Sequence, residues 1–167
     1  MTTIPPCVVD GSGCIVCPEV PPAPAIPPLI HPALVSGWGT GANSIAQLIG
    51  DMHTTFYMNT PNTAVVIGFK SVRDTAYDPT LIEHGLSFAY AGSVPVVYVI
   101  EYGVAKTSPR AYVGSTAAVP GSVFTIDRIG TIVTYYINNI PFYISTIPSV
   151  GPQLVCACPY ASGDEVL

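Results

Sequence analysis

The residues whose types and spacing best suit chemistry are five cysteines, gathered near the two ends of the 167-residue chain. Cys7, Cys14 and Cys17 form one group, and Cys156 and Cys158 form the other. Thiolates two or three positions apart can point at one ion, because the bend of a Cys-x-x-Cys turn brings both sulfur atoms together. We therefore predict a four-thiolate site for zinc or an iron–sulfur cluster on Cys14, Cys17, Cys156 and Cys158, with Cys7 as a substitute ligand.

Two other states of these cysteines stay open. Disulfides between the groups would tie the N-terminal segment to the last strand, and the odd count would leave one thiol free or intermolecular. The N-terminus has no Lys or Arg and so lacks the charged region of a secretory signal, which indicates synthesis in a cytoplasm and disfavours disulfides there. Oxidation after a virion leaves the cell would still allow them. Unligated thiols are the third alternative.

The histidines do not form a catalytic pattern. His31, His53 and His84 each stand alone in the sequence, outside any His-x-x-x-His or His-Glu-x-x-His frame. No nucleophile elbow accompanies them. We therefore predict that the protein is not an enzyme.

Aromatic residues are the candidates for binding. Tyr98 and Tyr102 are an even number of positions apart on one predicted strand, so they share a face of the sheet. Trp38, between two glycines, is predicted to plug the core or an interface. An exposed tyrosine suits a sugar or protein surface because it offers a flat apolar ring and a hydroxyl. A place in the core is the alternative for each of these residues.

The composition determines which elements position these residues. Charged residues make up only 9% of the chain and hydrophobic residues 49%, with 18 prolines, 15 glycines and 10 tyrosines. Many β-branched and aromatic residues with little charge favour strands over helices and over disorder. The net charge is −5 and the five basic residues are scattered, which excludes tracking of a nucleic-acid backbone. The longest apolar runs are strand-sized, so no membrane insertion is expected. A surface so poor in charge predicts coverage by partner chains.

The chain divides into two parts. Residues 1–35 hold half of the prolines and only two charged residues, so we expect an extended, largely polyproline arm. Its aliphatic side chains predict that it docks on its own domain or on a neighbouring subunit, and a plain linker is the alternative. Residues 36–167 consist of short apolar runs separated by turn residues.

The clearest element of the second part is a meander over residues 123–145. Two strands are expected at 123–128 and 131–137. Asn138-Asn139 then supplies the positive-φ pair of a tight hairpin, and a third strand returns over 140–145. About ten to twelve short strands at this spacing predict an all-β fold, a two-sheet antiparallel jelly-roll sandwich. A helical turn is expected near 78–83.

The meander also carries a resemblance to a known family. The run Phe124-Thr-Ile-Asp-Arg-Ile-Gly-Thr-Ile-Val-Thr-Tyr-Tyr-Ile-Asn-Asn, followed by Pro-Phe-Tyr-Ile-Ser, resembles the sandwich of concanavalin-type and laminin-G-type domains. Pro159-Tyr-Ala-Ser-Gly-Asp is similar to the closing segment of that family. Ala42-Asn-Ser-Ile-Ala-Gln-Leu-Ile-Gly-Asp is similar to versions of the domain in bacteriophage tail proteins. The resemblance covers residues 36–167 and departs at Asn139, where glycine is usual.

The resemblance implies adhesion or sugar recognition. Hydrolases of this fold place three carboxylates alternately along one strand, but Glu101 has no acidic partner two residues away, which argues against glycosidase activity. We therefore expect a phage virion protein of the tail tip or baseplate, assembled in the host cytoplasm. Its expected partners are other tail and baseplate proteins, further copies of itself within the particle, and a host surface glycan or protein. A stand-alone carbohydrate-binding, lectin-like module is the alternative.

Overall fold

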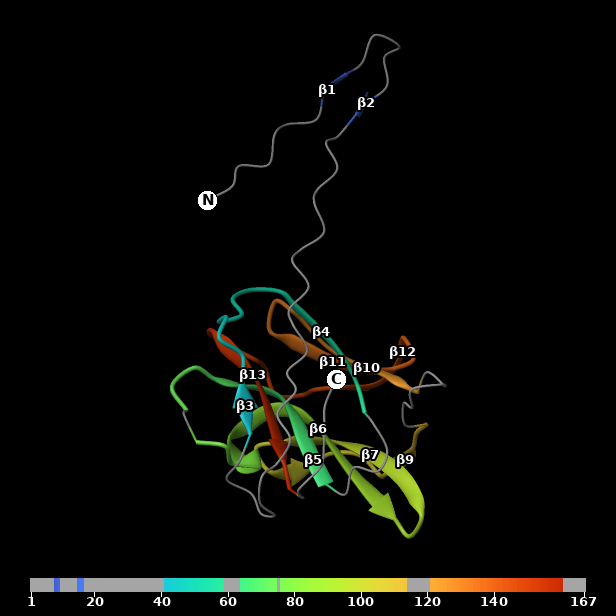
Figure 1. The fold of residues 1–167 in the computed structure, drawn as a ribbon. Coiled ribbons are helices and arrows are strands. Elements are labelled where there is room, and N and C mark those ends of the chain that lie inside the picture. The colour runs from blue at the N-terminus through green and yellow to red at the C-terminus, as the bar shows by residue number, and fades with distance from the viewer. Residues whose placement is uncertain are drawn as a thin grey trace.

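The computed structural model describes residues 8–9, 15–16, 41–58, 64–74, 76–113 and 121–160. Within these residues the chain forms an all-β, two-sheet antiparallel jelly-roll sandwich, as the sequence predicted (Figure 1). The one helical element among the described residues is a short 3-10 turn, η1 (Pro79–Leu81), in the region where a helical turn was expected. The Asp78 side chain caps this turn by accepting a hydrogen bond of 2.8 Å from the Thr80 amide.

One layer is a four-stranded sheet in the order β12-β11-β10-β4. Its strands are β4 (Met52–Tyr57), β10 (Val123–Ile129), β11 (Ile132–Ile137) and β12 (Ile140–Ile144). The last three form the predicted meander, with bounds within one residue of those expected. Asn138 and Asn139 have φ angles of 52° and 62°, the left-handed conformation that a two-residue hairpin turn requires.

The other layer is a seven-stranded sheet in the order β3-β13-β5-β6-β7-β8, with β9 also paired to β7. Its strands are β3 (Ala42–Asn43), β5 (Ala64–Ser71), β6 (Ile82–Ala91), β7 (Val94–Glu101), β8 (Val104–Ala105), β9 (Arg110–Ala111) and β13 (Gln153–Pro159). β3, the first strand of this sheet in the chain, pairs antiparallel with β13, the last.

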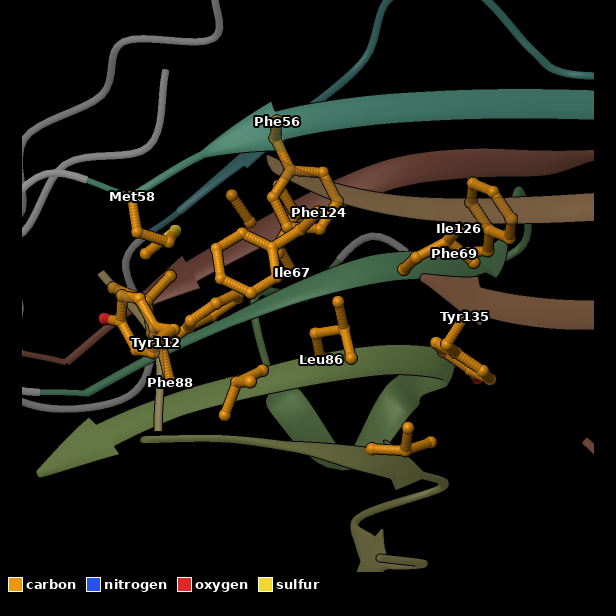
Figure 2. Close-up of a cluster of buried hydrophobic side chains, with 14 of the residues drawn as sticks. Phe56, Met58, Ile67, Phe69, Leu86, Phe88, Tyr112, Phe124, Ile126 and Tyr135 are labelled. Carbon is orange, nitrogen blue, oxygen red and sulfur yellow. The ribbon is translucent and has the colours of Figure 1, made fainter. Parts of the chain in front are cut away.

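Strand alternation places the main core between the two layers. Phe56 and Phe124 from the four-stranded sheet meet Phe88 from the seven-stranded sheet, with ring centroids 4.8–6.1 Å apart. Figure 2 shows these rings at one end of the cluster, beside Met58 and Tyr112, while Tyr135 lies at the other end. Tyr135 is fully buried and Tyr136 is half-buried, as expected for adjacent residues that point to opposite faces.

A smaller apolar cluster lies on the opposite side of the seven-stranded sheet. It contains Val66, Ile82, Cys156 and Cys158, with Tyr77 and Ile100 packed against it. These side chains are buried although they point away from the main core. The outer face of this sheet, meaning the face turned away from the other layer, is therefore covered in this region.

One apolar run lies outside the strands, and one sequence expectation needs correction. In the run at residues 45–49, Ile45 and Ile49 are exposed and Leu48 forms an isolated β-bridge with Gln153. The strand expected to reach Tyr102 ends at Glu101, because Tyr102 adopts a φ of 50° and turns the chain.

The N-terminal arm lies almost entirely outside the described residues. Within it, the structure describes a short hairpin of β1 (Val8–Val9) and β2 (Ile15–Val16), which the polyproline prediction did not anticipate. The division between arm and sandwich at residue 35 stays a prediction. No helix of the described residues is long and apolar enough to cross a membrane.

Candidate functional site

The outer face of the four-stranded sheet carries a group of hydrogen-bonding side chains at its centre. Because β4 pairs antiparallel with β10, His53 lies opposite Asp127 and Thr55 lies opposite Thr125. Phe56 and Ile126 point into the core from the same strands, so these polar residues point outward. Thr134 on β11 lies opposite Asp127 and completes the group. We call His53, Thr55, Thr125, Asp127 and Thr134 the polar patch.

The imidazole of His53 is held by both of its nitrogen atoms. Nδ1 lies 2.6 Å from Oδ1 of Asp127, and Nε2 lies 3.1 Å from Oγ1 of Thr55. Thr55 Oγ1 in turn lies 3.2 Å from Oγ1 of Thr125. The His53 side chain is 70% exposed and that of Asp127 is 20% exposed. An exposed histidine with both nitrogens engaged has a defined orientation, which is how a preformed binding surface is built.

Two tyrosines flank the polar patch on the same face. Tyr136 lies opposite Thr125, and Tyr57 is two residues beyond Thr55 along β4. Tyr57 is 40% exposed and Tyr136 is half-buried. The two rings offer flat apolar surface beside the hydrogen-bonding groups.

An isoleucine patch borders the polar patch toward the β10–β11 turn. It consists of three residues. Ile129 on β10 and Ile132 on β11 lie directly opposite each other, and Ile144 on β12 lies opposite Thr134 on β11. Their exposed fractions are 69%, 59% and 59%. The face thus combines hydrogen-bonding groups, aromatic rings and exposed aliphatic carbon.

Sequence reasoning missed this face. His53 was placed outside any motif, and Asp127 entered the sequence analysis only as part of the run that carries the family resemblance. Alternation along the meander could have placed Thr125 and Asp127 on one face. No local pattern predicts that β4 is the neighbour of β10, because that pairing joins segments far apart in the chain.

The structure places only two of the predicted thiolate ligands. Cys156 and Cys158 lie on the outer face of the seven-stranded sheet, fully buried and free, with their sulfur atoms 3.5 Å apart. Cys7, Cys14 and Cys17 lie outside the described residues. Among the residues that are described, no group of three or more His, Cys, Asp or Glu side chains could hold a metal ion.

Lys70 influences the two thiols. It is fully buried on β5, its Nζ donates a hydrogen bond of 2.6 Å to the Ala76 carbonyl, and it lies 5.7 Å from the centre of the Tyr77 ring. The hydrogen bond from Cys158 lowers the pKa of Cys156, burial opposes this effect, and the Lys70 charge assists it. The pKa of Cys158 is raised by the same hydrogen bond and by burial. One proton is therefore lost more readily than from an ordinary thiol, and the second is retained.

The structure describes two of the three aromatic binding candidates, Tyr98 and Tyr102. Tyr98 is half-buried on the outer face of the seven-stranded sheet. Tyr102 is 48% exposed in the turn after β7, with its ring centroid 6.5 Å from that of His84. Trp38 lies outside the described residues. Their binding roles stay predictions.

Glu101 lies inside the sandwich, where it belongs to a buried polar group. The Tyr135 hydroxyl donates a hydrogen bond of 3.2 Å to its Oε1, and His84 Nδ1 lies 3.5 Å from the same atom. Burial raises the pKa of Glu101, but the polar side chains of His84, Ser145 and Tyr135 stabilise its charged form more, so the pKa lies below its usual value. A carboxylate with no exposed surface is not placed to act on a glycosidic bond.

No protein-family model and no curated protein matches the sequence. Solved structures do match the fold. Galectin LEC-6 of Caenorhabditis elegans is 15% identical, with 84% of this chain and 87% of that chain covered and a TM-score of 0.42. The TRIM65 PSpry domain is 11% identical, with 78% and 70% covered and a TM-score of 0.47. The carbohydrate recognition domain of Emp47p is 10% identical, with 79% and 78% covered and a TM-score of 0.44.

Glycoside-cleaving enzymes are also among the matched structures, including a β-glucanase of Bacillus licheniformis. At these identities the likeness concerns the sandwich architecture and does not place a ligand. Nothing in the comparisons links the chain to bacteriophage tail proteins.

Proposed function

We propose that this protein is a carbohydrate-binding module whose sugar ligand lies over the polar patch of the four-stranded sheet. The observation that carries the proposal is the oriented His53 ring, held between Asp127 and Thr55 on an exposed face that also bears Tyr57. The proposal rests on this surface and not on the likeness to galectins.

The chemistry of the face matches the two kinds of surface on a sugar. Hydroxyl groups of a sugar need donors and acceptors in fixed positions. The Asp127 carboxylate and the hydroxyls of Thr55 and Thr134 can supply them, while the His53 ring, whose two nitrogens are engaged by Asp127 and Thr55, keeps those groups in place. The C–H face of a pyranose ring is apolar and packs on an aromatic ring, which Tyr57 and Tyr136 can supply. Because the patch is already hydrogen-bonded within itself, binding orders few side chains and costs little conformational entropy.

The charges on the face favour a neutral sugar. The polar patch and its two tyrosines contain Asp127 and no Lys or Arg. The whole chain carries a net charge of −5. A sulfated or sialylated glycan would therefore meet repulsion at the patch, whereas the hydroxyls of a neutral sugar can donate to Asp127.

A glycan array followed by calorimetric titration of the best neutral ligand tests the proposal. Asp127→Ala and Tyr136→Ala should each weaken binding by about tenfold or more, the loss expected for one hydrogen bond to a charged group or one stacked ring. Tyr98→Ala is the matched control, because it removes a tyrosine from the outer face of the other sheet, and it should leave affinity unchanged. Absence of binding to every glycan, or loss of binding only in Tyr98→Ala, would contradict the proposal.

The isoleucine patch supports a second candidate, a structural role in a virion tail tip or baseplate. Ile129, Ile132 and Ile144 are each more than half exposed, and a neighbouring subunit would bury them. The sequence resemblance to phage tail domains motivates this particle as the setting. If the isoleucine patch is such a contact, Ile132→Lys should abolish incorporation into tail particles and leave sugar binding unchanged. Normal incorporation of this variant would exclude the patch as the contact.

A further inference from the structure

A groove opens along one side of the sandwich, between β9 and the β11–β12 hairpin. β12 is the edge strand of the four-stranded sheet, and β9 lies at the edge of the seven-stranded sheet on the same side of the molecule (Figure 1). The groove has a volume of about 400 Å³ and is lined by Arg110, Ala111, Ile137, Asn138, Ile140 and Phe142. It is distinct from the polar patch, none of whose residues lines it.

Arg110 supplies a positive charge to the groove. It lies opposite Val97 on β7, whose side chain belongs to the main core, so the Arg110 side chain also points to the inner side of the sheet. There its Cζ lies over the Phe142 ring, 5.4 Å from the ring centre. This contact occupies the flat face of the guanidinium and leaves the N–H groups at its edge able to donate. Neither of the ion pairs among the described residues involves Arg110, and no Asp or Glu lines the groove.

Asn138 and the apolar residues form the rest of the wall. The Asn138 Oδ1 accepts a hydrogen bond of 2.9 Å from the Val123 amide, which orients the side chain and leaves its amide nitrogen to donate to a ligand. Ile140 is exposed and Phe142 is half-buried. The groove therefore combines two donors suited to a carboxylate with a surface suited to an apolar side chain.

The backbone of β9 offers a free strand edge beside these side chains. The Tyr112 amide donates a hydrogen bond of 3.1 Å to the Pro95 carbonyl, so by alternation the N–H and C=O of Ala111 point away from β7. At the next outward-pointing residue, Val113, this edge is already paired, because the Ser122 amide donates to the Val113 carbonyl at 2.6 Å. The unpaired edge thus begins at Ala111, which lines the groove.

We propose that this groove binds an extended peptide segment of a partner protein, in which an acidic residue is followed two positions later by an apolar one. Residues two apart on an extended strand share a face and lie about 6.6 Å apart, so both side chains enter the groove. The carboxylate pairs with Arg110 and Asn138, the apolar side chain lies on Ile140 and Phe142, and the peptide backbone adds as a strand to Ala111.

Charge and shape both favour this occupant. The chain carries a net charge of −5, so most of its surface repels an acidic segment, and Arg110 marks the place where such a segment is attracted. A free anion would use only the two donors and would leave the apolar wall and the strand edge exposed. An extended peptide uses all three features. The site goes beyond the sugar-binding function and does not depend on it.

Fluorescence polarisation with labelled nonapeptides tests the proposal on the full chain. The probe peptide has a glutamate followed two positions later by a leucine, in a background of threonine and glycine. It should bind saturably. A glutamine in place of the glutamate should weaken binding by at least about tenfold, because the charge-assisted hydrogen bonds are lost. A glycine in place of the leucine should also weaken it, because the apolar wall is then left uncovered.

Protein variants identify the groove as the site. Arg110→Gln should weaken binding of the glutamate peptide by at least about tenfold. Lys106→Gln is the matched control, because it removes an exposed cation beside β8 and gives the same net charge, and it should leave the affinity unchanged. Ala111→Pro removes the outward N–H without removing a β9–β7 hydrogen bond, and it should weaken binding by about fivefold. Each variant should keep the sugar affinity of the wild type, so the two proposals fail separately.

Chemical-shift mapping of the wild-type chain with the glutamate peptide requires no variant to fold. The amide signals of Arg110, Ala111 and Asn138 should shift. Equal affinity for the glutamate and glutamine peptides, equal losses in Arg110→Gln and Lys106→Gln, or shifts confined to other residues would overturn the proposal. So would a single glutamate, capped at both ends, that binds as tightly as the peptide, because the groove would then be a site for small anions.

Discussion

The two ends of the space between the sheets are filled by different chemistry, although both are buried. At the aromatic end, Phe56, Phe88 and Phe124 pack edge-on or stacked against one another, with Tyr112 beside them (Figure 2). At the polar end, Glu101 accepts a hydrogen bond from the Tyr135 hydroxyl, and the His84 ring lies beside it. Each of these polar side chains is fully buried.

The difference lies in how each end depends on its partners. Dispersion contacts among rings are numerous and weakly directional, so the loss of one leaves the others in place. A buried carboxylate depends on a few particular donors, and removal of one partner leaves another group unpaired. Substitutions that remove side-chain volume should therefore lower the stability of the fold most at the aromatic end. At the polar end, the loss of a charge or a hydrogen bond should lower stability even when the volume is kept.

Phe88→Ala should give the largest loss of stability. The Phe88 ring packs edge-on against those of Tyr112 and Phe124, with centroid distances of 5.5 Å and 4.8 Å. Removing it leaves a cavity between the sheets and should lower the free energy of unfolding by about 3–5 kcal/mol, measured by urea denaturation. Phe88→Leu, which keeps most of the volume, should cost less than half as much. Equal losses in both variants would show that volume does not govern this end.

Glu101→Ala should cost about 3 kcal/mol, because it leaves the Tyr135 hydroxyl and the His84 ring without their carboxylate. Glu101→Gln is the matched variant, since its amide oxygen can still accept the hydrogen bond from Tyr135. We expect it to recover at least half of the loss in the same urea experiment. If the alanine and glutamine variants were equally unstable, the negative charge and not the hydrogen bond would hold this end together.

The same contrast separates what the sequence predicted from what it did not. The aromatic end follows from alternation, because Phe124 and Ile126 occupy every second position of one strand. The meander was placed correctly because Asn138-Asn139 has a local conformational requirement. Local patterns are visible to sequence reasoning because each is contained within a few residues.

The polar end and the polar patch depend on pairings between distant strands. His84, Glu101 and Tyr135 come from β6, β7 and β11, and each looks like an isolated interruption of an apolar run. His53 and Asp127 meet only because β4 adds to the edge of the meander. Hydrophobicity alone does not reveal whether a partner strand covers a segment: the apolar run at residues 45–49 lies outside the strands, with Ile45 and Ile49 exposed.

Tyr135→Phe should have a smaller effect, because the ring and its packing remain. The variant removes one hydroxyl that donates to Glu101 at 3.2 Å. We expect the free energy of unfolding to fall by about 1 kcal/mol. In the Glu101→Gln background the same substitution should cost measurably less, since a neutral amide accepts a weaker hydrogen bond than a carboxylate. A double-mutant cycle with no coupling would place the two side chains out of contact in solution.

The pH dependence of stability should give the smallest effect and should isolate the charge of Glu101. Its pKa in the folded protein lies below the ordinary value, because His84, Ser145 and Tyr135 favour the carboxylate despite burial. The folded state therefore binds this proton less readily than the unfolded chain does. The resulting stabilisation is complete above the unfolded pKa, about 4.3, and disappears as the pH falls through the lower folded pKa. Asp78 also has a lowered pKa, owing to its hydrogen bonds with Thr80, but it is common to the wild type and to Glu101→Gln and so its effect cancels in their difference.

Urea midpoints measured between neutral pH and pH 3 should show that the stability advantage of the wild type over Glu101→Gln shrinks as the pH falls. An advantage that stays constant over this range would mean that Glu101 is already protonated in the folded protein, and the polar end would then be held by neutral hydrogen bonds alone.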